Sequence, residues 1–86
     1  MDYIVYILHS LKDHKLYIGC TTDIDERLIR HNSGGVEATK YRRPLTLIHS
    51  EKFDDKATAF NRERFLKSLW GSREKKKILQ KYLAKP

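Results

Sequence analysis

The stretch Tyr3-Ile4-Val5-Tyr6-Ile7-Leu8, six β-forming residues in a row, decides how the start of this chain folds. Neighbouring side chains of a strand point to opposite faces, so an unbroken apolar and aromatic run predicts a strand covered on both sides, in the centre of a sheet. The polar stretch 10–14 leads to a second short strand over residues 15–20. Two strands joined by so short a connection predict an antiparallel hairpin.

A helix is predicted directly after the hairpin, from about Asp23 to residue 31 or 32. Asp23 followed by Glu26 resembles a capping box, and Gly34 suits a left-handed C-terminal cap. The stretch from there to Pro44 is predicted to be irregular.

The second half of the chain predicts one more strand and two more helices. The strand spans residues 45–51, and the next helix runs over about 56–70 and ends at Gly71. Ser72 is expected to cap a third helix that ends at about residue 83. The order β-β-α-β-α-α predicts one α+β domain over residues 1–86, a three-stranded antiparallel sheet with three helices packed on it.

Composition narrows the class of protein. With 86 residues, 40% of them hydrophobic and 34% charged, the chain has room for one small core and is too apolar for a disordered tail. No apolar run is long enough to cross a membrane, and the first residues do not resemble a signal peptide. One cysteine and four histidines predict neither a disulfide nor a zinc site. We therefore expect a cytoplasmic protein.

The net charge of +7 is concentrated in the second half of the chain. Residues 1–43 carry 7 basic and 6 acidic side chains, whereas residues 44–86 carry 11 and 5. This imbalance favours a polyanionic partner such as nucleic acid. The alternative is a basic surface with no particular partner.

Glu63 stands at an unusual place in the second helix. At about 100° per residue it shares one narrow stripe with Ala59, Leu66 and Trp70, in the middle of the apolar face. A carboxylate there is costly unless it is paired, protonated or bound to a cation. Glu63 is therefore either a functional carboxylate or half of a structural ion pair with an arginine.

Other candidate residues have ordinary structural explanations when each is taken alone. Arg27 borders the inward stripe of the first helix, which includes His31, and could simply extend to solvent. Tyr6 and Tyr17 could be core tyrosines with satisfied hydroxyls. Gly19 shares a strand face with Tyr17 and leaves room there for a phosphate or another backbone to approach.

Together these residues resemble the GIY-YIG nuclease superfamily. Ile4-Val5-Tyr6 stands where that family has Gly-Ile-Tyr, and Tyr17-Ile18-Gly19 matches the second triplet. Arg27 stands on the first helix and Glu63 on the second, where the family has its arginine and its acidic residue. The resemblance covers almost the whole chain. The chain most resembles the small stand-alone members of the superfamily, which are similar to the nuclease domains of UvrC and of junction-resolving endonucleases.

The resemblance implies a hydrolase of DNA phosphodiesters that uses one divalent metal, Mg²⁺ or Mn²⁺, in DNA repair or recombination. Glu63 would hold the metal, Tyr6 or Tyr17 would act as general base or position the water, Arg27 would bind the scissile phosphate and His31 would assist. The charges of Arg27 and the metal are expected to lower the pKa of the tyrosine. Mg²⁺ tolerates a single protein carboxylate because it keeps several waters.

Further contacts to nucleic acid are expected from basic and aromatic residues around this site. Residues 39–44 mix both kinds, which suits phosphate contacts and stacking on unpaired bases, although a plain surface loop is the alternative. The expected nucleic-acid-binding residues are Lys15, Arg30, Lys40, Tyr41, Arg42 and Arg43.

Two positions depart from the family pattern. Ile4 replaces the first glycine, and no asparagine follows Glu63. We therefore expect low or partner-dependent activity. The alternatives are a non-catalytic nucleic-acid-binding module with the same fold and an accessory subunit that docks an acidic protein. DNA is the expected substrate, RNA remains an alternative, and a protein partner would supply targeting.

Overall fold

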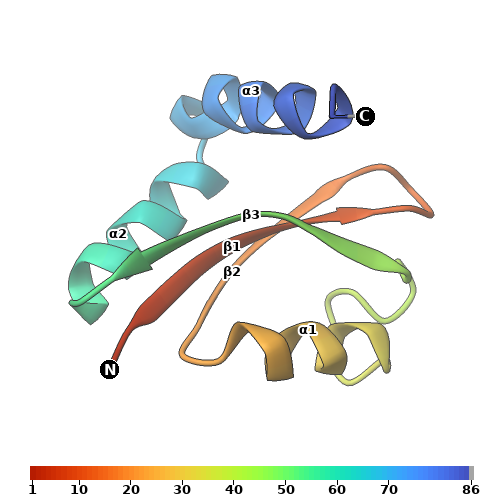
Figure 1. Ribbon diagram of the computed structural model, residues 1–86. Coiled ribbons are helices and arrows are strands. Elements are labelled where there is room, and N and C mark those ends of the chain that lie inside the picture. Colours follow the sequence, from red (N-terminus) through yellow and green to blue (C-terminus); the bar gives the residue numbers. More distant parts are fainter. Residues whose placement is uncertain (86) are drawn as a thin grey trace.

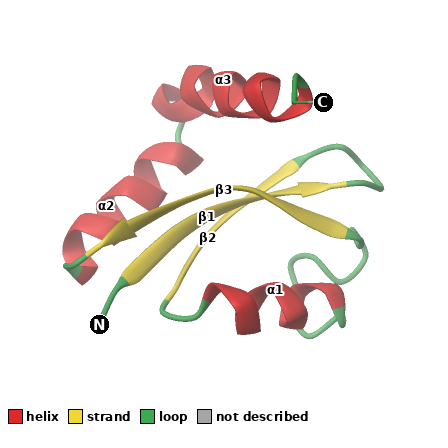
Figure 2. Ribbon diagram, viewed as in Figure 1, coloured by secondary structure: helices red, strands yellow, loops and turns green. Residues whose placement is uncertain are grey.

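The computed structural model describes residues 1–85 and has the predicted order of elements. Strands β1 (Tyr3–Ser10), β2 (Leu16–Thr21) and β3 (Leu45–Phe53) form one antiparallel sheet in the order β2-β1-β3. The helices are α1 (Ile24–Asn32), α2 (Lys56–Lys67) and α3 (Ser72–Leu83), with a short 3-10 helix η1 (Leu69–Gly71) between the last two (Figures 1 and 2). The α+β prediction and the central place of the first strand are confirmed.

Helices cover the sheet on both faces, which explains the unbroken apolar run of β1. Helix α1 lies against one face, while α2 and α3 lie on the other (Figure 1). On the α1 side, Tyr6 and Leu8 pack with Leu45 and with partly buried residues of α1. On the α2 side, Val5 and Ile7 form the larger core with residues Ile18, Ala59 and Leu66. Within residues 1–85, no helix is long and apolar enough to span a bilayer.

The ends of α1 follow the predicted capping residues. The carboxylate of Asp23 accepts a hydrogen bond from the Glu26 amide at 3.1 Å, and Gly34 adopts a left-handed φ of +87° after the last turn. The Glu26 side chain pairs with Arg30 rather than turning back to Asp23, so only one half of the capping box forms.

The predicted end of the second helix is wrong. Helix α2 ends at Lys67 because Ser68 adopts an extended backbone and its hydroxyl donates to the Phe65 carbonyl at 2.6 Å. The turn that follows leaves Trp70 85% exposed, so Trp70 does not belong to the inward stripe. Helix α3 begins after Gly71, and the side chain of Ser72 makes no capping hydrogen bond.

One arginine joins α2 to its neighbours on the side of the sheet away from α1. Arg62 donates to both carboxylate oxygens of Glu51 on β3, at 2.8 and 2.9 Å, and to both oxygens of Glu74 on α3, at 2.7 and 2.8 Å. Hydrogen bonds from Arg62 hold the pKa of each carboxyl below its usual value. Paired bidentate bonds of this kind fix orientation as well as charge, so Arg62 sets the position of α3 against β3.

Replacing Arg62 by leucine is expected to lower the free energy of unfolding by about 1–2 kcal/mol at pH 7, because Glu51 loses its charged partner in a half-buried position. The pKa values of Glu51 and Glu74 are lowered by folding, so this stabilisation exists above their unfolded values and disappears as the pH falls through the folded ones. Urea denaturation at pH 7 and pH 3 measures both effects. Arg64→Leu, an exposed neighbour on the same helix, is the control, and equal losses in the two variants would contradict the assignment.

Candidate active site

Tyr6 and Gly19 face each other across strands β1 and β2. A side chain at Gly19 would overlap the phenol ring of Tyr6, so the glycine provides the space in which this ring lies. Our expectation that a phosphate or another backbone approaches Gly19 is wrong, because the Tyr6 ring occupies that space. The pair fixes Tyr6 against the edge strand.

A buried chain of hydrogen bonds holds the hydroxyl of Tyr6. Its Oη lies 2.9 Å from Nε2 of His31, and Nδ1 of His31 lies 2.8 Å from Oγ1 of Thr39. All three side chains are fully buried. His31 belongs to the last turn of α1 and Thr39 to the loop that follows, so the chain joins β1, α1 and this loop.

His31 positions Tyr6 rather than meeting a substrate itself. Burial, and then the positive charge of Arg27, lower the pKa of His31, so its imidazole is neutral at pH 7. A neutral imidazole has one donor and one acceptor nitrogen, and Tyr6 and Thr39 occupy both. The expected catalytic assistance from His31 is therefore revised to a positioning role, because no part of its ring is exposed.

Thr39 is the residue of this hydrogen-bonded series that the sequence did not predict. It lies in an irregular loop, where no periodic pattern marks a buried residue. The one available signal is chemical: a buried histidine needs a partner for each ring nitrogen, and small hydroxyl residues nearby are candidates.

Burial raises the pKa of Tyr6 to about 12. The Arg27 guanidinium opposes this effect, and the negative charge of Glu63 adds to it. Desolvation of the phenolate therefore outweighs the nearby arginine in the protein without a cation, and the lowering expected from Arg27 together with a bound metal stays a prediction. Tyr6 keeps its proton at neutral pH.

Tyr17 and Arg27 are half-buried and border the same cluster. The Tyr17 ring packs edge-on against His31, with 5.0 Å between ring centroids, and lies 6.4 Å from the ring of Tyr6. Tyr17 keeps part of its surface exposed, so a substrate can reach it more easily than Tyr6. The Nε of Arg27 is buried without an acceptor among the described residues, which leaves this donor desolvated and unpaired.

Glu63 lies on α2, on the other side of the sheet, and its side chain is 19% exposed. Its carboxylate is 2.9 Å from Nζ of Lys67, one turn further along the helix, and it lines a pocket with Phe60, Arg64 and Lys67. Among the described residues, Glu63 has no arginine partner of the kind that a structural role predicts. The neighbouring Arg62 pairs with Glu51 and Glu74 instead. A pair with a half-exposed lysine contributes only about 0.3–0.5 kcal/mol.

Arg27 and Glu63 act with opposite charge on the same two groups of the sheet, the Cys20 thiol and the Tyr6 hydroxyl. Burial is the main cause that raises the pKa of Cys20 on β2, Glu63 raises it further, and Arg27 opposes both. Glu63 and Arg27 act on Tyr6 in the same opposed manner. Arg27 belongs to α1 and Glu63 to α2, and these two helices lie on opposite faces of the sheet, of which β2 is an edge strand (Figure 1).

Glu63 offers this edge one carboxylate ligand for a cation. Within residues 1–85, no three His, Cys, Asp or Glu side chains gather into a metal site. Mg²⁺ keeps several waters and often binds through one or two carboxylates together with substrate phosphates. The donors present therefore fit a largely hydrated ion shared with a phosphodiester, and they do not fit a metal enclosed by protein.

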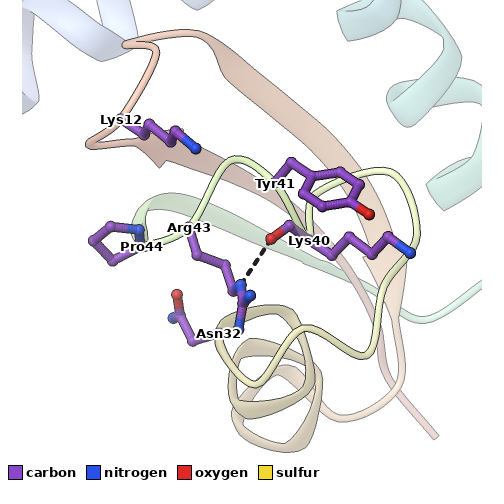
Figure 3. A pocket seen from close by; sticks show the side chains of 6 residues that line it. All are labelled: Lys12, Asn32, Lys40, Tyr41, Arg43 and Pro44. Atoms are coloured by element: carbon purple, nitrogen blue, oxygen red, sulfur yellow. Dashed lines mark hydrogen bonds between the residues drawn. The ribbon is translucent and has the colours of Figure 1, made fainter.

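Three of the expected nucleic-acid-binding residues gather at one pocket. Lys40, Tyr41 and Arg43 line it together with Lys12, Asn32 and Pro44 (Figure 3). The Lys40 ammonium lies 5.0 Å from the centroid of the Tyr41 ring, which is 75% exposed. Arg43 donates from Nε to the Lys40 carbonyl at 2.8 Å (Figure 3), and its guanidinium lies next to Gly34.

The other three expected residues lie apart from that pocket. Arg42 donates from Nε to Asp13 at 2.8 Å and from Nη2 to the Leu16 carbonyl at 3.4 Å, so it ties the loop to the hairpin. This pairing gives Arg42 a structural role, and the nucleic-acid contact expected of it stays a prediction. Arg30 is exposed and pairs with Glu26, and Lys15 is exposed at the start of β2.

Comparison with known proteins places this cluster in a family. The family model of the GIY-YIG catalytic domain matches residues 2–77. The chain belongs to the GIY-YIG family. The match includes both tyrosine-containing strands and the helices that carry Arg27 and Glu63, so this GIY-YIG chain has a domain of the endonuclease type.

Several UPF0213 proteins are similar to this GIY-YIG chain over most of its length. The UPF0213 protein of Natronomonas pharaonis is 44% identical over 79 residues, which cover 91% of this chain and 89% of that protein. The UPF0213 protein of Staphylococcus saprophyticus is 45% identical over 73 residues, covering 84% and 85%. The solution NMR structure of the UPF0213 protein BH0048 from Bacillus halodurans matches with a TM-score of 0.55 and 36% identity, covering 93% of this chain and 84% of that one.

The Tyr6→Phe substitution is expected to make the free energy of unfolding fall less steeply as the pH rises above 10. The pKa of Tyr6 is about 12 when folded and 10.0 ordinarily, so the unfolded chain loses this proton first. The contribution is complete below pH 10 and declines by about 1.4 kcal/mol per pH unit up to the folded pKa. Urea denaturation between about pH 8 and pH 11 gives the slope of the free energy of unfolding against pH for the wild type and for Tyr6→Phe.

The exposed Tyr41 provides the control for this measurement. Tyr41→Phe should keep the wild-type slope, because its hydroxyl lies on a side chain that is 75% exposed. Equal slopes for the wild type and Tyr6→Phe would show that the Tyr6 hydroxyl is not held protonated by the fold.

Proposed function

We propose that this protein is a metal-dependent endonuclease that hydrolyses DNA phosphodiester bonds, using Mg²⁺ or Mn²⁺, on structured or single-stranded substrates. The observation that carries the proposal is that Arg27 and Glu63, on helices that cover opposite faces of the sheet, act with opposite charge on Cys20 in the edge strand β2, which also carries the partly exposed Tyr17. Membership of a nuclease family supports the same reaction class.

Arg27 is the proposed phosphate-binding residue. A guanidinium presents a planar set of donors that matches two phosphate oxygens, and its charge stabilises the negative charge that develops in the transition state. Arg27 has already lost water from its Nε without gaining an acceptor in the described structure. A bound phosphate would therefore meet a guanidinium of which one nitrogen has already lost its water.

The two tyrosines are proposed to divide the work. Tyr6 is protonated and immobilised by His31, so it orients the site and supports the Tyr17 ring. Tyr17 is the more exposed of the two, so its hydroxyl is proposed to position the attacking water or, as the phenolate, to accept one proton from it. Glu63 holds the cation, which when bound supplies positive charge at the scissile phosphate and the leaving oxygen.

The pocket of Lys40, Tyr41 and Arg43 is proposed to hold the DNA strand outside the reacting bond. It follows Thr39 in the loop, and Thr39 is fixed to His31, so the pocket is attached to the same cluster. Two cations and an exposed ring suit a phosphate and an unpaired base. Lys15 and Arg30 would add phosphate contacts without sequence preference, and RNA offers the same chemistry to all of them.

A non-catalytic nucleic-acid-binding module is the second candidate. It is favoured by the pairing of Glu63 with Lys67, which competes with a cation, and by the absence of an asparagine after Glu63. In either case we propose a cytoplasmic protein whose choice of target depends on a protein partner or on the structure of the nucleic acid.

Glu63→Gln is expected to abolish metal-dependent cleavage of branched, single-stranded and duplex DNA, because the amide keeps the shape of the side chain but loses the charge that binds the cation. The free energy of unfolding without metal should change by less than about 0.5 kcal/mol, since the variant loses only a weak pair with Lys67. Gel assays with Mg²⁺, Mn²⁺ or chelator, together with thermal melts, measure the two effects.

Lys67→Gln is the matched control. It removes the same ion pair but leaves the carboxylate, so it should keep cleavage and show the same small change in stability. A Glu63→Gln protein that cleaves like the wild type would overturn the proposed site. Wild-type protein that binds DNA but does not cleave it with either metal would favour the second candidate.

A further inference from the structure

Two large apolar side chains stand side by side in solvent between α2 and α3. Leu69 is 90% exposed and Trp70 is 85% exposed. Isolated exposed apolar residues are common on protein surfaces and need no explanation. An exposed tryptophan next to an exposed leucine on one turn, with cations around the indole, is not an isolated residue of this kind.

The turn that carries Leu69 and Trp70 is fixed by its contacts. Gly71 is buried, and a side chain there would collide with the backbone of Phe65 and Leu66. The amide of Gly71 also donates to the Ser68 carbonyl at 3.1 Å. Because the backbone at Gly71 packs against the end of α2, the turn is a rigid platform that presents the two preceding side chains outward.

The surroundings of the indole are positively charged. Trp70 lines a pocket with Phe65, Arg73, Glu74 and Lys77. Arg73 and Lys77 are one turn apart on α3 and so lie on the same side of that helix. The one carboxylate of the pocket, Glu74, is paired with Arg62 through two hydrogen bonds at 2.7 and 2.8 Å. The charges of Arg73 and Lys77 therefore remain without a carboxylate partner in the pocket.

We propose that the Leu69–Trp70 turn is a second nucleic-acid site, which binds unpaired nucleotides. The indole of Trp70 stacks on a base, and Arg73 and Lys77 contact the phosphates beside it. A flat exposed ring flanked by cations matches a strand in which bases alternate with phosphates. A second copy of this chain fits less well, since each copy carries a net charge of +7.

This site is separate from the proposed cleavage site. Glu63 and Phe65 are two residues apart on α2, which places them about 200° apart around the helix axis. Glu63 lines a pocket with Phe60, Arg64 and Lys67, whereas Phe65 lines the pocket of Trp70. The proposal shares with the proposed function only the assumption that the ligand is nucleic acid, and its role would be to hold an unpaired arm away from the scissile bond.

Trp70 is the one tryptophan of the chain, so its fluorescence reports directly on this turn. The full chain is titrated with oligothymidylate, oligouridylate, a duplex of the same length and polyglutamate, in Mg²⁺-free buffer. We expect saturable quenching by both single strands, weaker quenching by the duplex and none by polyglutamate. Equal quenching by polyglutamate would overturn the proposal in favour of an acidic protein partner.

Variants test whether the indole contributes to affinity. Trp70→Ala should weaken binding of oligothymidylate, measured by anisotropy of a labelled strand, by roughly tenfold, while Trp70→Phe should keep most of it. Leu83→Ala is the control, because it removes another exposed apolar side chain, 62% exposed, from the end of α3. Unchanged affinity in Trp70→Ala, or sedimentation that shows self-association lost in this variant, would overturn the proposal.

The outcome is separable from that of the proposed function. Glu63→Gln should keep the full fluorescence quenching even where cleavage is lost. Quenching without cleavage by the wild type would support this site and favour the non-catalytic candidate over the endonuclease. Cleavage without quenching would overturn this site and leave the endonuclease standing.

Discussion

The burial of one hydroxyl, that of Tyr6 in the central strand, is the constraint on which the rest of this small structure depends. A buried hydroxyl without a partner costs about 1–3 kcal/mol, a large part of the stability of a domain of this size. The fold meets this cost with Gly19, which makes room for the ring, and with His31, which binds the hydroxyl. Because His31 in turn needs Thr39, the loop after α1 must fold over the cluster. The arrangement that positions the candidate active site is therefore also a requirement of folding.

Helix α2 has one flank that holds the fold together and another that carries the proposed metal ligand. Arg62 turns toward β3 and α3, where two carboxylates neutralise it, and its neighbour Glu63 turns toward the β2 edge with only a half-exposed lysine as partner. Charges that are fully paired hold elements together, whereas Arg27 and Glu63 are weakly paired and can respond to a ligand. The same division recurs in the loop, where Arg42 is engaged with Asp13 and its neighbour Arg43 faces an open pocket.

Local sequence signals were sufficient for most of the fold. The apolar run of β1, the Asp23 cap and Gly34 each act through their own backbone, so the hairpin and the first helix could be predicted. The end of α2 could not be predicted, because it depends on the contact of Gly71 with the preceding helix. The helical spacing alone predicted that Trp70 faces inward. Arg27 and Glu63 could be singled out by their unusual positions on helix faces. Their partners could not, because periodicity gives the face of a residue and says nothing of which charge lies across from it.

The central claim is that Glu63 holds a cation at the edge of β2, opposite Arg27, when a phosphodiester is bound. Paramagnetic broadening by Mn²⁺ in NMR spectra, recorded with a DNA strand whose phosphorothioate linkages resist cleavage, tests it directly. The account predicts that broadening is centred on Glu63 and extends to Cys20 and Arg27, and that it requires both the ion and the strand. Broadening centred on another acidic segment, such as Asp54 and Asp55 before α2, would contradict it.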